Sequence, residues 1–308
     1  MPALRCSIDD AIPEGMRLDR YVAEYLRLFS RSQSKVRKLE GKVNNKKVKL
    51  SFPVRQGDDL ELVWNDVETP ELIPEKGSLD IVYEDDQVVV INKGQNIVVH
   101  PGAGNYRGTL ANFLYFRQLE KGASVTNSLR PGIVHRLDKD TSGVIIAAWN
   151  DTAHAFLSEQ FKARTVKKTY VALVNGILKN ETGRIETHIA RDPGNRMKFA
   201  VSEKGKTAVT LFRVIKTWQT HTLVMLRPRT GRTHQLRVHM KYLGHPITGD
   251  MLYGIKDTLF PQATLMLHAR TLELTLPENR GRRKFSAPLP ERFSDLIRKL
   301  DRIESGRL

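Results

Sequence analysis

The sequence has almost no cysteine and no long apolar segment. Cys6 is the only cysteine among 308 residues, which excludes an internal disulfide and a zinc site built from several cysteines. Because no run of about 18 apolar residues is present, we expect no membrane-spanning helix and no membrane partner. The N-terminus lacks the long apolar region of a secretion signal, which favours a cytoplasmic location.

Motifs for bound nucleotides and metals are also missing. Residues 102–108 nearly form a glycine-rich dinucleotide loop, but the third glycine comes one position late, and no Gly-Lys-Ser/Thr phosphate loop occurs. His234 and His239 are five residues apart, so they do not share a helical face, and no acid or cysteine joins them. We therefore expect neither a metal ion nor an organic cofactor.

Acidic residues are too few to balance the basic ones. Lys and Arg number 50 against 34 Asp and Glu, which gives a formal net charge of +16. Such an excess indicates a polyanionic partner, because neutralised phosphates release counterions on binding, and we expect RNA. The chain length and a hydrophobic content of 40% suit about two domains with real cores, in a protein that we expect to be a monomer.

Half of the net charge lies in residues 16–49, which hold 11 Lys or Arg and 3 Asp or Glu. Apolar residues at helical spacing predict a helix over residues 18–29, and Ser32 can cap a second helix that stops near Gly41. Short strands are predicted at 42–44, 47–49 and 59–64, with a turn at Asn44-Asn45. A solvated helix face is the ordinary explanation of such charge, but the one-sided excess favours RNA contacts by Arg17, Arg31, Lys35, Lys38 and Lys42.

This segment resembles the small alpha-L RNA-binding domain first described in ribosomal small-subunit protein four. The matching stretches are residues 16–21, 30–32 and 41–46. The family usually has Asn-Gly at the turn, whereas this chain has Asn44-Asn45; asparagine tolerates the left-handed conformation better than other non-glycine residues. The resemblance implies an RNA-binding module over residues 1–66. Residues 67–78 have two prolines and no apolar periodicity, and we interpret them as a linker.

The rest of the chain, residues 79–308, is rich in strand-like runs. These lie at 80–84, 87–92, 143–148, 169–175, 183–189, 207–215 and 221–227. Helices are predicted after Asn150 or Asp151, between Thr230 and Gly244, and near the C-terminus. Because strands and helices do not alternate regularly, we expect an α+β fold with a mixed or antiparallel sheet rather than a parallel dinucleotide-binding sheet.

The most informative stretch is His135-Arg136-Leu137-Asp138-Lys139-Asp140-Thr141-Ser142-Gly143, which stands between two apolar runs. Buried strands are scaffold, and residues at the end of a rigid strand can be held to catalytic tolerance. A plain alternative is a polar turn whose Asp and Thr side chains bond their own backbone. Chemistry alone does not decide between these two interpretations.

The whole stretch, however, resembles the signature of pseudouridine synthases of the RluA/RluD type, with Asp138 at the position of the catalytic aspartate. Four further blocks of the chain resemble the same family, and together they cover nearly its whole length: residues 89–102, 168–170, 230–239 and 249–269. Gly94 departs from the family pattern, where proline is usual. The resemblance implies isomerisation of uridine to pseudouridine, a redox-neutral reaction that needs no cofactor.

The resemblance also implies roles for single residues. Tyr170 corresponds to the active-site tyrosine and can stack on the uracil and exchange a proton at its carbon 5. Arg232 corresponds to the active-site arginine and can hold the Asp138 carboxylate; its place at a predicted helix start also favours a nearby anion. Arg136 can fill the stack that an extruded uridine leaves. Further substrate or RNA contacts are expected from His135, Thr141 and Lys93.

Several alternatives stay open at this point. Asp138 can attack the ribose, attack the uracil ring or abstract a sugar proton. Large-subunit ribosomal RNA is the expected substrate, because the appended N-terminal module is commonest among the family members that act on it. The same chemistry on tRNA is the enzymatic alternative, and a non-catalytic RNA-binding or ribosome-assembly factor is the alternative from another class.

Overall fold

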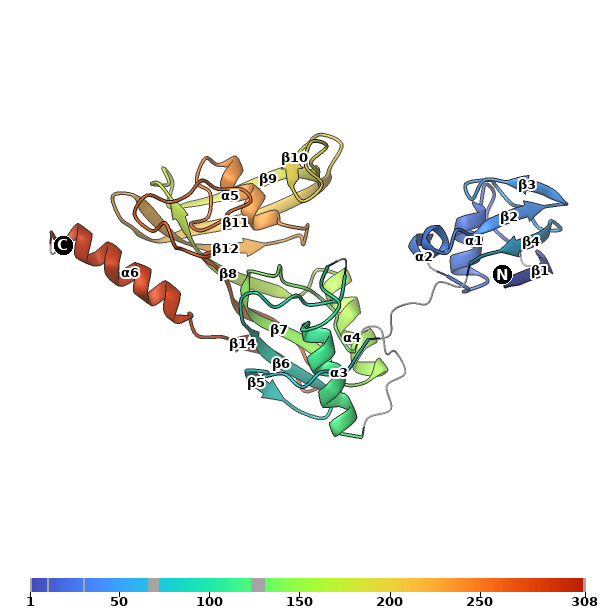
Figure 1. The fold of residues 1–308 in the computed structure, drawn as a ribbon, viewed down its shortest axis with the longest axis horizontal. Coiled ribbons are helices and arrows are strands. Elements are labelled where there is room, and N and C mark those ends of the chain that lie inside the picture. The colour runs from blue at the N-terminus through green and yellow to red at the C-terminus, as the bar shows by residue number, and fades with distance from the viewer. Residues whose placement is uncertain are drawn as a thin grey trace. The chain divides into compact units, whose positions relative to one another are not determined.

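The computed structural model describes residues 2–9, 11–29, 31–65, 72–102, 104–122 and 131–306, without the side chain of Ser32. The chain forms two compact units, residues 1–71 and 72–308 (Figure 1). The predicted linker at 67–78 spans the boundary between them, and its residues 67–71 lie outside the described part. Leu72 is buried in the core of the second unit.

The first unit is a four-stranded antiparallel sheet with two short helices. Strand order is β1-β4-β2-β3. Leu18 and Val22 of the first helix and Leu60 and Leu62 of the sheet share one apolar core. The elements are β1 Ala3–Ser7, α1 Leu18–Glu24, α2 Arg31–Val36, β2 Glu40–Val43, β3 Lys46–Val48 and β4 Asp59–Val63.

The sequence predicted the hairpin turn of this unit correctly, but it did not predict the ends of the helices correctly. The helix predicted over 18–29 ends at Glu24, and Arg27 adopts a positive φ of 51°. The hairpin turn is confirmed: Asn44 and Asn45 have φ of 49° and 64°, the two left-handed positions that a type I′ turn requires. The prediction of the second helix was wrong at both ends: α2 begins at Arg31, so Ser32 lies within it, and it ends at Val36 rather than near Gly41. The side chain of Ser32 lies outside the described part.

The second unit is built on a ten-stranded sheet with strand order β10-β9-β11-β12-β8-β13-β7-β6-β5, and β14 pairs with β13. Every described pair is antiparallel except β13 with β7, so the predicted α+β fold with a mixed sheet is confirmed. The strands are β5 Ile81–Glu84, β6 Val88–Lys93, β7 Ser142–Ala148, β8 Lys167–Asn175, β9 Thr182–Arg191, β10 Phe199–Val201, β11 Lys206–Thr217, β12 His221–Pro228, β13 Leu267–Thr275 and β14 Arg282–Ser286. The helices are α3 Leu110–Glu120, α4 Asp151–Lys162, α5 Gln235–Tyr242 and α6 Glu291–Glu304.

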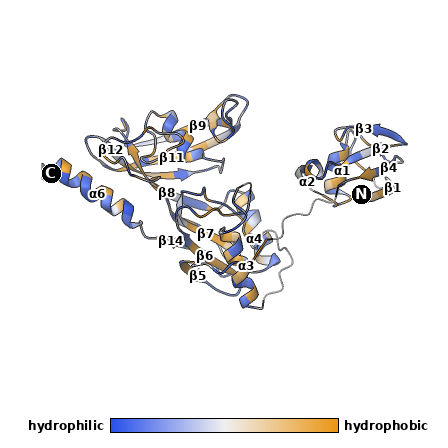
Figure 2. Cartoon of the chain, in the orientation of Figure 1, coloured by the Kyte–Doolittle hydropathy of each residue, from blue (hydrophilic) through white to orange (hydrophobic). Residues whose placement is uncertain are grey.

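Strands β6 and β7 are apolar on both faces because each face is covered (Figure 2). Val89 and Ile145 face a cluster that includes α3, whereas Val90 and Ile146 face a cluster that includes α4. A third cluster packs α5 and α6 against β8 and β12. Tyr170 of β8 packs against the first and the third of these clusters, so it lies where the two halves of the sheet meet.

Candidate active site

The loop that carries Asp138 is bounded by two glycines that no other residue could replace. Gly132 and Gly143 have positive φ of 65° and 118°. A Cβ atom would lie 1.7 Å from the carbonyl oxygen of Ala148 at the first position and 2.2 Å from that of Ala269 at the second. Both ends of the loop therefore lie directly against the backbone of neighbouring strands, and this restricts the position of Asp138.

Hydrogen bonds to its backbone hold this loop from behind. Lys93 Nζ donates to the carbonyl oxygen of Lys139 at 3.0 Å, and to those of Gly94 and Ile97. Burial lowers the pKa of Lys93 to about 8, while Asp140 and Asp138 oppose that shift. The expected RNA contact of Lys93 is therefore wrong, because only 1% of the residue is exposed and its ammonium is committed to three carbonyls.

Two side chains, those of Arg237 and His234, approach the Asp138 carboxylate. Its Oδ2 lies 3.8 Å from Nη1 of Arg237 and 3.9 Å from Nε2 of His234. Arg237 is fixed in turn by a bidentate pair with Asp250, at 2.8 and 2.7 Å. Asp250 also accepts hydrogen bonds from the backbone N–H groups of Leu252 and Tyr253. A buried guanidinium is thereby held with one nitrogen facing the carboxylate.

Arg232 does not hold the carboxylate, contrary to our expectation. It lines the same pocket, but its Nε donates to the carbonyl oxygen of Thr207 at 3.0 Å, and it makes no ion pair with Asp138 in the described structure. The predicted helix start at Thr230 is also wrong, because α5 begins at Gln235, after His234 in a left-handed conformation. That turn brings Arg237, not Arg232, to Asp138; both lie in the block that carries the family resemblance.

Tyr170 lies in the centre of the pocket and keeps its proton. Burial, with a smaller contribution from the Asp138 charge, raises the pKa of its phenol. The hydroxyl group makes no hydrogen bond to any described residue. A protonated, partly exposed ring of this kind can stack on a base and donate a hydrogen bond, whereas removal of a proton from carbon would require its phenolate.

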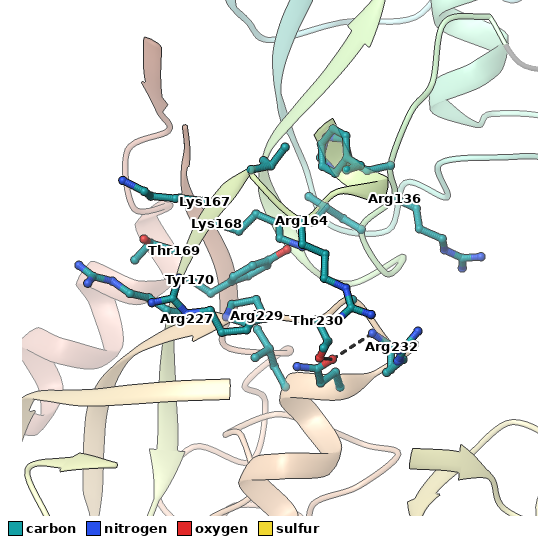
Figure 3. A pocket seen from close by; sticks show the side chains of 18 of the residues that line it. Arg136, Arg164, Lys167, Lys168, Thr169, Tyr170, Arg227, Arg229, Thr230 and Arg232 are labelled. Atoms are coloured by element: carbon teal, nitrogen blue, oxygen red, sulfur yellow. Dashed lines mark hydrogen bonds between the residues drawn. The ribbon is translucent and has the colours of Figure 1, made fainter. Parts of the chain in front are cut away.

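The pocket has a volume of about 890 Å³, and basic side chains surround Tyr170 in it (Figure 3). Its carboxylates are Asp138 and Glu273, and Glu273 is paired with Lys167 and Arg282. The basic residues of the lining are Arg136, Lys162, Arg164, Lys167, Lys168, Arg227, Arg229, Arg232, Arg237 and Lys284. Such a lining suits a polyanion that brings one neutral reacting group to a carboxylate.

Lys168 lines the pocket and belongs to the block of residues 168–170, but no role was predicted for it from the sequence. It lies two positions before Tyr170 on β8, and alternate residues of a strand share a face. Burial, with a smaller contribution from Arg164, lowers its pKa, and its ammonium makes no hydrogen bond or ion pair to any described residue. The alternation along β8 was the signal that could have singled it out.

Three further residues of the loop, His135, Thr141 and Arg136, differ in how far they are exposed to the pocket. His135 Nε2 accepts the N–H of Ile146 at 3.0 Å and its ring stacks on Phe161, while burial and then Lys168 lower its pKa to about 3. Its imidazole is therefore part of the framework, although it lines the pocket. Thr141 is buried, and its hydroxyl has no partner among the described residues. Arg136 is exposed at the pocket and likewise makes no described hydrogen bond or ion pair.

The predicted RNA-binding residues of the first unit are all at the surface. Arg17 and Arg31 pair with the buried Asp19, and their side chains remain 45% and 56% exposed. Lys42 pairs with Glu61 at 3.1 Å. Lys35 and Lys38 are exposed. Across the described ranges, no helix is long and apolar enough to cross a membrane, and no group of three His, Cys, Asp or Glu could hold a metal ion.

The known proteins that this chain resembles are RNA pseudouridine synthases. Residues 87–242 match a family model described as RNA pseudouridylate synthase. The ribosomal large subunit pseudouridine synthase D of Borreliella burgdorferi is 44% identical over 288 residues, which cover 91% of this chain and 88% of that protein. An uncharacterized RNA pseudouridine synthase of Bacillus subtilis is 39% identical over 92% of this chain and 94% of its own.

A solved structure shares the fold. The human RNA pseudouridylate synthase domain containing 4 superposes with a TM-score of 0.58 at 28% identity. The match covers 72% of this chain and 92% of the human one.

Proposed function

This chain belongs to the RNA pseudouridylate synthase family, on the RluA/RluD side of it, and we propose that it isomerises uridine in large-subunit ribosomal RNA. The observation that carries the proposal is the Asp138 carboxylate beside Arg237 and His234, in a pocket whose charged lining residues are mostly basic. The choice of RNA rests on the name of the Borreliella burgdorferi relative. A cytoplasmic location belongs to the same proposal.

In the reaction, the bond between ribose carbon 1′ and uracil nitrogen 1 breaks, and carbon 1′ bonds to carbon 5. The proton of carbon 5 is lost, nitrogen 1 gains one, and no electrons are exchanged with another molecule. We assign Asp138 as the anionic catalyst, because a carboxylate is a suitable partner for an electron-poor sugar carbon. The bidentate pair with Asp250 lets Arg237 face Asp138 without closing the pocket.

Tyr170 and Lys168 are assigned to the substrate. The Tyr170 ring stacks on the uracil, and its retained proton makes it a hydrogen-bond donor rather than a base at neutral pH. Lys168 has a free ammonium in the pocket, and we assign it to a phosphate beside the target uridine. Both side chains come from the same face of β8, so base and phosphate contacts are placed together.

Arg136 is assigned to base extrusion. A uridine in a stacked RNA must leave the stack, at a cost of a few kcal/mol. Arg136 is exposed at the pocket and makes no described ion pair, so its guanidinium is available to occupy the vacated position. Its replacement by Met should impair turnover strongly on a stacked uridine and weakly on a flexible oligonucleotide, where extrusion costs least; equal loss on both substrates would refute this role.

The first unit is assigned to RNA binding through the exposed face of Arg17, Arg31, Lys35, Lys38 and Lys42. Asp19 holds Arg17 and Arg31 side by side and leaves about half of each exposed. Exposed cations of this kind bind phosphates and carry no sequence information by themselves. The choice of uridine therefore falls to the second unit and to the fold of the RNA.

A pseudouridine map of total RNA, with and without this gene, tests the proposal. We expect one or more large-subunit ribosomal positions to disappear without the gene and to return with the wild-type copy. Asp138→Asn keeps the side-chain volume and should restore none of them, while the purified variant should bind RNA as tightly as the wild type. Loss of tRNA positions alone would reassign the substrate, and no change anywhere would favour a non-catalytic factor.

A further inference from the structure

His234 has a backbone conformation that needs an explanation. Its φ is 55°, in the left-handed region, and it stands directly before α5. Such a conformation costs a non-glycine residue on the order of 1 kcal/mol and is found most often where neighbouring structure requires it. The turn directs the two ring nitrogens to different partners. Nδ1 lies 2.8 Å from the hydroxyl oxygen of Tyr253, and Nε2 faces Asp138.

The hydrogen bonds of Tyr253 determine which nitrogen carries the proton. Tyr253 is 5% exposed, and its hydroxyl oxygen accepts the backbone N–H of Phe199 at 2.8 Å. Burial raises the pKa of its phenol, so the hydroxyl keeps its own proton. Among the described contacts, the only acceptor for that proton is Nδ1 of His234. The Nδ1 atom therefore accepts, and the proton of the neutral ring is on Nε2.

The surroundings keep the ring neutral. Burial lowers the pKa of His234; Asp138 opposes this shift, Arg237 and Arg136 add to it, and Asp250 opposes it. A protonated ring would also leave the buried Tyr253 hydroxyl without an acceptor. The Nε2–H group is thus a neutral donor 3.9 Å from Oδ2 of Asp138.

We propose that Tyr253 holds His234 as its Nε2-protonated tautomer and that this N–H orients the Asp138 carboxylate for the reaction. The inference rests on the proposed function of Asp138. Arg237 approaches the same oxygen, Oδ2, at 3.8 Å. Two donors on one oxygen leave Oδ1 free to face the substrate. Both distances exceed a hydrogen bond in the free protein, and we expect them to shorten when the substrate is bound.

Two substitutions at His234 separate this role from a merely structural one. His234→Asn suits the left-handed backbone and keeps a polar group near Tyr253, but it does not reach Asp138. His234→Gln places an amide donor near the position of Nε2. In single-turnover assays at saturating RNA, we expect His234→Asn to lower the rate roughly 10- to 100-fold, and His234→Gln to recover most of it. RNA affinity should change less than about twofold in both.

Equal rates in His234→Asn and the wild type would overturn the proposal, and so would equal losses in both variants. A second measurement needs no activity. In ¹⁵N spectra of histidine-labelled protein, His234 should show a proton on Nε2 and none on Nδ1. Tyr253→Phe should abolish that preference. A Nδ1-protonated ring in the wild type overturns the inference, whereas a wild type that makes no pseudouridine overturns only the function proposed for the site.

Discussion

The two units of this protein use charge in opposite ways. Arg17, Arg31 and Lys42 of the first unit keep about half of their side chains exposed even where they form ion pairs. Arg237 and Asp250 of the second unit are 8% and 0% exposed, and each hydrogen bond between them is at most 2.8 Å. Exposed charges are screened and individually weak, whereas buried ones depend on a single partner. We therefore expect RNA affinity to be distributed over the first unit and catalysis to depend on single residues of the second.

The largest expected effect is the loss of stability and activity on replacing Arg237, compared with replacing Arg232 of the same sequence block. Arg237→Met leaves the buried Asp250 without its counter-charge, which should lower the free energy of unfolding by about 3–5 kcal/mol. It should also lower single-turnover rates at least roughly 100-fold, because Asp138 loses its charged neighbour. Arg232→Met is the matched control and should cost less than about 1 kcal/mol. Denaturant unfolding and single-turnover assays of both variants measure these losses. Comparable losses in the two variants would refute the assignment of Arg237, rather than Arg232, as the partner of Asp138.

Acid should destabilise the second unit selectively, because it holds all nine histidines of the chain. Burial lowers the pKa of His239 and of His268 to about 4. The unfolded chain therefore binds more protons than the folded one between pH 6.5 and 4. The free energy of unfolding should fall across that window as pH drops, by on the order of 3 kcal/mol for each histidine.

Hydrogen exchange, followed peptide by peptide in the whole chain, measures this difference. Protection in the second unit should fall from pH 6.5 to 4 while protection in the first unit stays constant. His239→Gln removes one titrating group and should flatten the decline. A parallel loss of protection in both units would contradict the role given to the buried histidines.

A smaller effect is expected at Lys168. Lys168→Met removes an unpaired cation from the pocket and should weaken binding of a substrate oligonucleotide about 5-fold, with the log–log salt slope reduced by about 0.7–0.9. Lys162 lines the same pocket with an 81% exposed side chain, so Lys162→Met should change the affinity less than about twofold. Equal effects of the two substitutions would mean that Lys168 contributes only to the overall positive potential of the pocket and does not contact a particular phosphate.

The smallest effect on turnover is expected in the first unit. Replacing Lys35 and Lys38 together by Gln should reduce the salt slope of RNA binding by about 1.4–1.8 and leave the single-turnover rate at saturating RNA unchanged. Filter-binding titrations at several salt concentrations measure the slope. If the slope does not change, this face is solvated surface and the RNA-binding assignment of the first unit fails.

Local patterns predicted much of this molecule. All seven apolar strand-like runs of the second unit are strands, because a short run of apolar residues is a property of neighbours in the chain. The pair Asn44-Asn45 predicted its own turn for the same reason. The predictions were incomplete: strands β1, β10, β13 and β14 were not identified, and neither was α3, which has an irregular apolar face.

The contacts within the candidate site, by contrast, could not be predicted from local sequence patterns. Sequence resemblance located Asp138, Tyr170 and the block of residues 230–239. It did not identify which arginine of the block reaches the carboxylate, nor that Lys93 is buried. Those outcomes depend on atoms that are far apart in the chain: Arg237 meets Asp138 across about a hundred residues of sequence.

The sequence by itself determined the seven apolar strands of the second unit, the left-handed asparagine turn, the concentration of charge in residues 16–49 and the chemical groups of the site. Each of these follows from residues close together in the chain. Only the tertiary structure decided which of those groups meet. The left-handed turn at His234 sets the direction of α5, and the junction of β8, β13 and β7 sets the position of the Asp138 loop. A difference of five residues between Arg232 and Arg237 is small in sequence, but the turn between them points the two guanidinium groups to different partners.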